Sequence, residues 1–109
     1  MDVNDRIKAV LDAHPLVLFM KGTPQFPMCG FSSRAAQMLR EVGAPFHAVN
    51  VLEDPELRAA LPRYANWPTF PQLFLHGELL GGCDITLELK ASGELQRLAQ
   101  ETALRGDAA

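Results

Sequence analysis

The chain has 109 residues, of which 48% are hydrophobic, and a formal net charge of −3. This length fits one domain, which we expect to span residues 1–109 with an ordered core over about 3–103. The slight acidity excludes a basic footprint for nucleic acid. No apolar run approaches the ~20 residues that a membrane span requires.

Two features of the sequence indicate the compartment. The first residues, Met1 to Arg6, lack the basic start and the apolar centre of a signal peptide. The two cysteines, Cys29 and Cys83, are too few for a disulfide scaffold or for a metal site of four cysteines. We therefore expect a cytoplasmic protein, whose thiols stay reduced.

The first half of the chain predicts helices alternating with strands. Apolar residues at helical spacing predict an amphipathic helix over 3–13, which Pro15 ends. The apolar run 16–20 suits a strand that is buried on both faces. A loop then leads to Cys29 and to a helix that Gly43 stops, with a predicted buried stripe of Phe31, Ala35, Met38, Leu39 and Val42.

A second strand is expected over 46–51, followed by a third helix. Asp54 can cap this helix, and Pro55 fits its first turn. Its predicted buried stripe comprises Leu57, Ala60, Leu61 and Tyr64. Pro62 lies inside the helix and would clash with the carbonyl of Arg58, so we expect a kink or an early break there.

The last third of the chain predicts a hairpin and two helices. Residues 72–76 and 79–80 form the predicted hairpin around Gly77-Glu78. A short helix is expected from Cys83-Asp84 to Gly93, and a final helix is marked by Leu95, Leu98, Ala99 and Thr102, after which the chain should fray. Strands that alternate with helices and then pair antiparallel imply an α/β fold with a mixed sheet covered on both faces. The thioredoxin fold is one small fold with this pattern.

Cys29 lies between a buried strand and a helix, where it has a predicted chemical role. Backbone N–H groups and the helix dipole stabilise a thiolate at such a position. Ser32 occupies the second position of the Cys-x-x-Cys spacing, so a two-cysteine cycle within the motif is excluded. The alternative is that Cys29 is a small buried side chain. Cys83 follows two glycines, and a turn that needs only a small residue is favoured there over a redox role. A Cys29–Cys83 disulfide is a hypothesis that needs their Cα separation.

Four blocks of sequence resemble one family. Cys29-Gly30-Phe31-Ser32 resembles the Cys-Gly-Phe-Ser active site of monothiol glutaredoxins, and Met20–Pro24, Trp67–Gln72 and Gly81–Asp84 stand in that family's order and spacing. The resemblance runs from the first helix to the Gly93 region. It implies a thioredoxin fold, with a central four-stranded mixed sheet flanked by helices, and a glutathione site.

The resemblance implies two cations in that site. Lys21 is similar to the family lysine beside the active cysteine, where it favours thiolate and meets a glutathione carboxylate. Arg58 matches the family arginine that pairs with the glycine carboxylate of glutathione. Without the resemblance, Lys21 is a solvated residue at a strand end and Arg58 is an exposed helix residue.

It also implies contacts from the backbone and from a helix start. Phe70 and Pro71 resemble the family's cis-proline turn, whose free backbone pairs with the cysteinyl part of glutathione; a trans proline is the alternative. Cys83 and Asp84 stand where family members bind the γ-glutamyl end. Asp84 is otherwise an ordinary N-cap.

The resemblance implies a function in iron–sulfur chemistry. A [2Fe–2S] cluster commonly takes four thiolates, and the family arrangement is a homodimer that holds the cluster through Cys29 and glutathione from each subunit. Cluster delivery to apo iron–sulfur acceptor proteins follows, with BolA-like proteins as further partners. The alternatives are a glutathione-dependent thiol–disulfide oxidoreductase, in which Cys29 attacks mixed disulfides, and an interaction module without a redox cycle. The apolar loop 25–28 would alter partner contacts.

Overall fold

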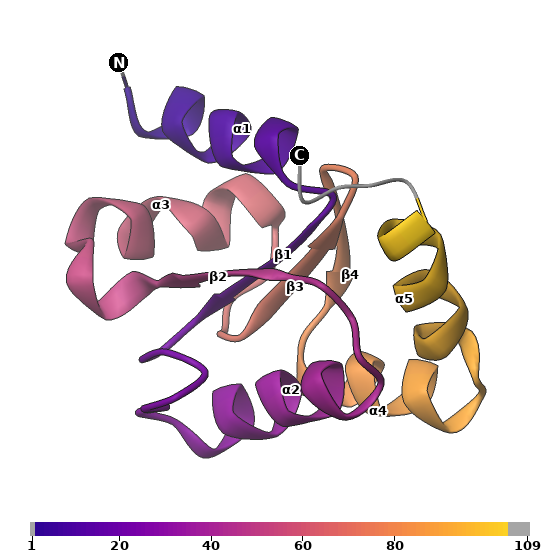
Figure 1. The fold of residues 1–109 in the computed structure, drawn as a ribbon. Helices are drawn as coiled ribbons and strands as arrows, with labels where there is room; N and C mark the ends of the chain where they lie inside the picture. Colours follow the sequence, from indigo (N-terminus) through magenta and orange to yellow (C-terminus); the bar gives the residue numbers. More distant parts are fainter. Residues whose placement is uncertain (1, 105–109) are drawn as a thin grey trace.

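The computed structural model of the protein describes residues 2–104. At its centre is a four-stranded sheet of order β2-β1-β3-β4 (Figure 1). β1 (Leu16–Met20) pairs in parallel with β2 (His47–Asn50) and antiparallel with β3 (Gln72–Leu75). β4 (Glu78–Gly81) pairs antiparallel with β3. The mixed sheet of the thioredoxin fold is therefore confirmed.

Helices cover both faces of this sheet (Figure 1). α1 (Val3–Ala13) and α3 (Pro55–Ala65) lie against each other on one face. α2 (Gly30–Glu41), α4 (Cys83–Ala91) and α5 (Glu94–Leu104) form the layer on the other face. A single 3₁₀ turn, 51–53, connects β2 to α3.

The alternation of side chains along β1 builds two cores. Leu16, Leu18 and Met20 join the cluster under α2 and α5, whereas Val17 and Phe19 join the cluster under α1 and α3. All five are at most 1% exposed. The prediction of a strand buried on both faces is confirmed, because its continuous apolar run supplies both layers.

The start of α3 agrees with the sequence, but the predicted early break at Pro62 is wrong. The Asp54 side chain accepts a hydrogen bond from the Leu57 N–H at 3.1 Å, as a cap should. The helix continues through Pro62 to Ala65. Pro62 lies in the last turn, where only one intrahelical bond is lost, and the fully buried Leu61 holds that turn against the core.

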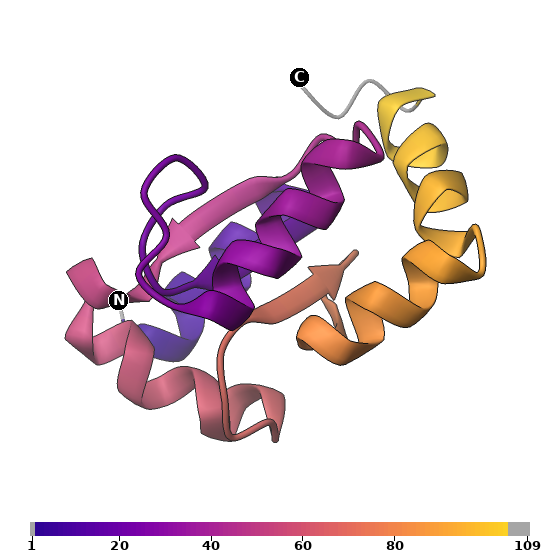
Figure 2. The same cartoon turned by 90° about the horizontal axis from the view of Figure 1, so that it is seen from below.

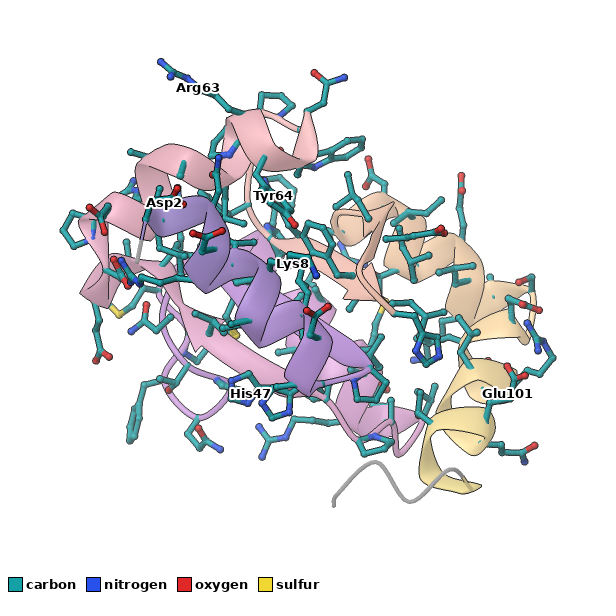
Figure 3. The ribbon with its side chains drawn as sticks, turned by 90° about the horizontal axis from the view of Figure 1, so that it is seen from above. Asp2, Lys8, His47, Arg63, Tyr64 and Glu101 are labelled. Carbon is teal, nitrogen blue, oxygen red and sulfur yellow. The ribbon has the colours of Figure 1, made fainter. Side chains whose placement is uncertain are left out.

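Two predicted core residues lie at the surface instead. Phe31 is 64% exposed, and the neighbouring Ser32 is buried in its place. Tyr64 is 38% exposed and lies at the surface of α3 on the side of Lys8 in α1 (Figure 3). Both residues stand near a helix end, where the buried stripe is set by the neighbouring loop and not by the helical period alone.

The hairpin turn is one residue earlier than predicted. His76 and Gly77 form the two-residue loop with φ values of 49° and 83°, and Glu78 already belongs to β4. Positive φ at both loop positions matches the right-handed twist of the strands. The predicted fraying concerns the tail after 103, which lies outside the described residues except for Leu104. Within 2–104, no helix has the length and apolar character needed to cross a membrane.

Candidate functional site

A tight loop after β1 places Cys29 at the start of α2 (Figure 2). The loop folds back on itself: the Met28 N–H donates to the Lys21 carbonyl at 2.9 Å, and Thr23 and Phe26 exchange backbone hydrogen bonds. Gly22, at φ +90°, makes this possible, because a Cβ there would lie 2.5 Å from the Phe26 carbonyl oxygen. The hydrogen bonds of this loop and the backbone conformation of Gly22 therefore fix the position of Cys29.

Cys29 is the N-cap of α2 and is partly exposed. The N–H of Ser32 is the largest cause that lowers the pKa of the Cys29 thiol, and the Phe31 N–H, the Ser32 hydroxyl and the Lys21 ammonium add to it. Desolvation opposes them without reversing the shift. The Cys29 thiol therefore ionises more readily than a free cysteine thiol, as its position before a helix predicted.

Ser32 has a second contact that explains its burial. Its hydroxyl oxygen accepts a hydrogen bond from the Lys21 N–H at 3.1 Å, and the side chain is fully buried. The residue that replaces a second cysteine therefore ties the end of β1 to the first turn of α2. A thiol would be a weaker acceptor at this position.

A pocket of about 740 Å³ opens beside Cys29. Its lining residues come from the starts of α2 and α4 and from the segment that leads from α3 into β3. The structure brings all seven residues of the predicted site into its lining: Lys21, Cys29, Arg58, Phe70, Pro71, Cys83 and Asp84. Segments far apart in the sequence thus form one concave surface.

Two cations from different elements line this pocket. Lys21 follows β1, and Arg58 lies on the exposed side of α3, four residues before Pro62. Within 2–104, neither side chain forms an ion pair with a carboxylate of the chain. Arg63, on the same helix, points outward from the fold (Figure 3). Arg58 and Lys21 are therefore placed to bind an anionic ligand.

The turn before β3 supplies free backbone groups. The Phe70–Pro71 peptide bond is cis, as the resemblance implies, and Pro71 is buried. Within the described part of the chain, neither the N–H nor the C=O of Phe70 has a backbone partner. An extended peptide can pair with such groups in the manner of an added strand.

The start of α4 forms the wall beside this turn. Its N-cap is Gly82, so the alternative interpretation of Asp84 as the N-cap is wrong. Gly82 has no side chain to bond the first-turn N–H groups, which leaves them available to a carboxylate. Burial raises the pKa of the Cys83 thiol, and the charges of Asp84 and Cys29 add to this. Both cysteines are free thiols in the structure, so their disulfide stays a hypothesis.

Several residues that line the pocket are not among the predicted site residues. Phe31, Trp67 and Ile85 contribute apolar surface to the pocket. A Cβ on Gly82 would lie 3.5 Å from the indole nitrogen of Trp67, so the indole packs closely over the start of α4. Trp67 and Gly82 both belong to sequence blocks that carry the family resemblance. Their place in these blocks is the sequence signal that could have predicted them as pocket residues.

Comparison with known proteins agrees with this geometry. The family profile described as Glutaredoxin matches residues 16–80. Glutaredoxin 4 of Haemophilus ducreyi is 50% identical over 105 residues, covering 96% of this chain and 98% of that protein. The solution structure of reduced poplar apo GrxS14 matches with a TM-score of 0.77 and 48% identity, over 94% of each chain. The crystal structure of a buckwheat glutaredoxin–glutathione complex has a TM-score of 0.80 and 25% identity, over 93% of this chain and 90% of that one. The chain belongs to the glutaredoxin family.

Proposed function

We propose that the protein binds glutathione in the pocket beside Cys29 and uses this complex to carry a [2Fe–2S] cluster. The observation that carries the proposal is the arrangement, in a single pocket, of one thiol of lowered pKa with two cations that pair with no carboxylate within 2–104. The structural match to a glutaredoxin solved with glutathione supports the first half of the proposal.

Each part of glutathione has a counterpart in the lining. Arg58 and Lys21 would meet the carboxylate of the glycine end. The free N–H and C=O of Phe70 would pair with the cysteinyl residue and direct its sulfur toward Cys29. The uncapped start of α4 would accept the γ-glutamyl carboxylate, and Asp84 its ammonium group. The tripeptide would then lie across the pocket in one extended conformation.

The number of thiolates leads from glutathione to the cluster. A [2Fe–2S] cluster commonly takes four thiolates. The chain has two cysteines, and only Cys29 has a lowered pKa, because Cys83 is shifted the other way. No three metal-ligating side chains lie together within 2–104. Cys29 and glutathione from each of two subunits would supply the four ligands, giving a cluster-bridged homodimer.

Such a complex suits transfer. Half of its ligands would be small molecules, which exchange more readily than protein side chains. The receiving partners would be apo iron–sulfur proteins in the cytoplasm, where glutathione keeps thiols reduced, and BolA-like proteins would be regulatory partners.

The exposure of Cys29 favours a second candidate, a glutathione-dependent oxidoreductase. The Cys29 thiolate would attack the glutathione sulfur of a protein–glutathione disulfide and release the protein thiol. A second glutathione thiolate would then attack the Cys29–glutathione disulfide, which restores Cys29 and yields oxidised glutathione. The net exchange converts the mixed disulfide and one glutathione thiol into the protein thiol and oxidised glutathione, and no second cysteine is needed.

Anaerobic reconstitution with iron, sulfide and glutathione distinguishes the two candidates. We expect a visible absorption spectrum of a [2Fe–2S] cluster and a native mass of two chains, one cluster and two glutathiones. A sample without glutathione and a Cys29→Ser variant should each remain a cluster-free protein, whereas Cys83→Ser should bind the cluster. A wild-type protein that binds no cluster but turns over a glutathione mixed disulfide would replace the carrier by the oxidoreductase.

A further inference from the structure

Gln72 is a buried polar residue that does not line the pocket beside Cys29. It is the first residue of β3, it is fully buried, and it lies opposite Phe19 on β1. Residues paired in this way project from the same face of a sheet. Its side chain therefore lies on the face of Phe19 and Phe74, under α1 and α3, where the other buried side chains are apolar.

The amide of Gln72 reaches back to the segment that precedes the cis-proline turn. Its Nε2 donates hydrogen bonds to the Trp67 carbonyl at 3.0 Å and to the Thr69 carbonyl at 3.4 Å. Its Oε1 accepts no hydrogen bond from any residue between 2 and 104. Packing alone would favour an apolar residue at this position, because an unpaired amide oxygen carries a desolvation penalty. The two hydrogen bonds to the loop offset that penalty.

The tethered segment is one wall of the pocket. Trp67, Thr69 and Phe70 all line it. The segment 66–71 belongs to no helix or strand, because α3 ends at Ala65 and β3 begins at Gln72. The Trp67 N–H is bonded to the Pro62 carbonyl at the end of α3, so Gln72 is the attachment of the same segment on its other side.

We propose that Gln72 is a positioning residue of the pocket, whose buried amide holds the Trp67–Thr69 backbone in the conformation that presents Trp67 and Phe70 to glutathione. This inference rests on the proposed glutathione site. It adds a residue that lies beneath the pocket wall and acts through the loop without touching the ligand.

The test uses Gln72→Met, which keeps the length of the side chain and removes both donors. Reduced glutathione is titrated by calorimetry under reducing conditions, and the emission of Trp67, the only tryptophan in the chain, reports the loop directly. We expect the Kd for glutathione to rise about fivefold, as for the loss of about one net hydrogen bond. The Trp67 emission should shift, and its quenching by acrylamide should increase, before any ligand is added.

Thr102→Val is the matched control. The Thr102 hydroxyl is also buried and also bonds two carbonyls, those of Leu98 and Ala99, but within α5. We expect this variant to lose thermal stability while its glutathione affinity stays within about twofold of the wild type. If Gln72→Met does not fold, Gln72→Asn keeps the amide and shortens its reach by one methylene, so both readouts should change in the same direction.

The outcomes separate the two proposals. An unchanged glutathione affinity and an unchanged Trp67 emission in a folded Gln72 variant would overturn the positioning role. A wild-type protein that fails to bind glutathione would overturn the proposed function, whereas an altered Trp67 emission in Gln72→Met would still support the role of Gln72 in holding the loop.

Discussion

The starts of α2 and α4 present two cysteines to one pocket, with opposite results. Cys29 is the N-cap of α2, and its thiol pKa is lowered. Cys83 is one position further along, inside the first turn of α4, and its thiol pKa is raised. Both residues have a helix N-terminus and a nearby arginine or lysine. Proximity to a helix N-terminus therefore does not decide reactivity.

The difference comes from where the side chain lies relative to the free N–H groups. An N-cap side chain faces the N–H groups of the second and third helical residues, here Phe31 and Ser32, and both lower the pKa of Cys29. Cys83 comes one residue after the N-cap Gly82, so its side chain does not face these N–H groups. Burial is then the largest cause of the shift in its thiol pKa. One position at a helix start thus separates a thiol of lowered pKa from a thiol of raised pKa.

Alkylation should show this contrast most strongly. In single-cysteine variants, Cys83→Ser should react with iodoacetamide at a midpoint pH below that of free cysteine, and Cys29→Ser at a midpoint above it. Because only thiolate reacts, the rate ratio should be largest below both midpoints, about tenfold or more in favour of Cys29, and should approach one above them. Mass spectrometry over a pH series measures both rates. Equal midpoints would contradict the cap argument.

The two helix starts also differ in the space they leave for a methyl group. A Cβ on Gly82 would lie 3.2 Å from the Pro71 carbonyl, whereas a Cβ on Gly30 meets nothing within 4 Å. We expect Gly82→Ala to weaken glutathione binding about fivefold, because the Pro71 carbonyl in the pocket wall must shift to admit the methyl group. Gly30→Ala, measured by the same titration, should stay within about twofold and should raise Tm slightly. Equal glutathione affinities in the two variants would show that the Pro71 carbonyl can shift without disturbing the pocket.

A smaller effect is expected from Ser32→Ala. The variant removes the hydroxyl that lowers the pKa of Cys29 and leaves the Lys21 N–H without its partner. The alkylation rate of Cys29 near neutral pH should fall about threefold, since the backbone N–H groups remain, and unfolding should cost about 1 kcal/mol less. Denaturant titration checks the stability, and Ser33→Ala is the control on the next residue. An unchanged midpoint pH of alkylation would leave the lowered pKa of Cys29 to the backbone N–H groups and Lys21.

The sequence alone determined the features that depend on neighbouring residues. The apolar run of β1, the Asp54-Pro55 start of α3 and the Gly43 stop of α2 follow local rules of burial and capping, and the structure has all three. The motif blocks likewise contain six of the predicted site residues that line the pocket: Lys21, Cys29, Phe70, Pro71, Cys83 and Asp84. Each of these signals lies within a few residues of the feature that it predicts.

Tertiary structure decided the rest. Pro62 does not break α3, because the neighbouring Leu61 is packed into a core shared with α1 and β1, which the local helix-breaking rule for proline does not take into account. Phe31 faces solvent because Ser32 takes the buried place beside β1. Gln72 is predicted from the sequence as an ordinary strand residue, and only the structure shows that its amide donates a hydrogen bond to the Trp67 carbonyl. In each case the deciding partner is a side chain or backbone group brought close by folding, and helical or strand periodicity carries no information about such contacts.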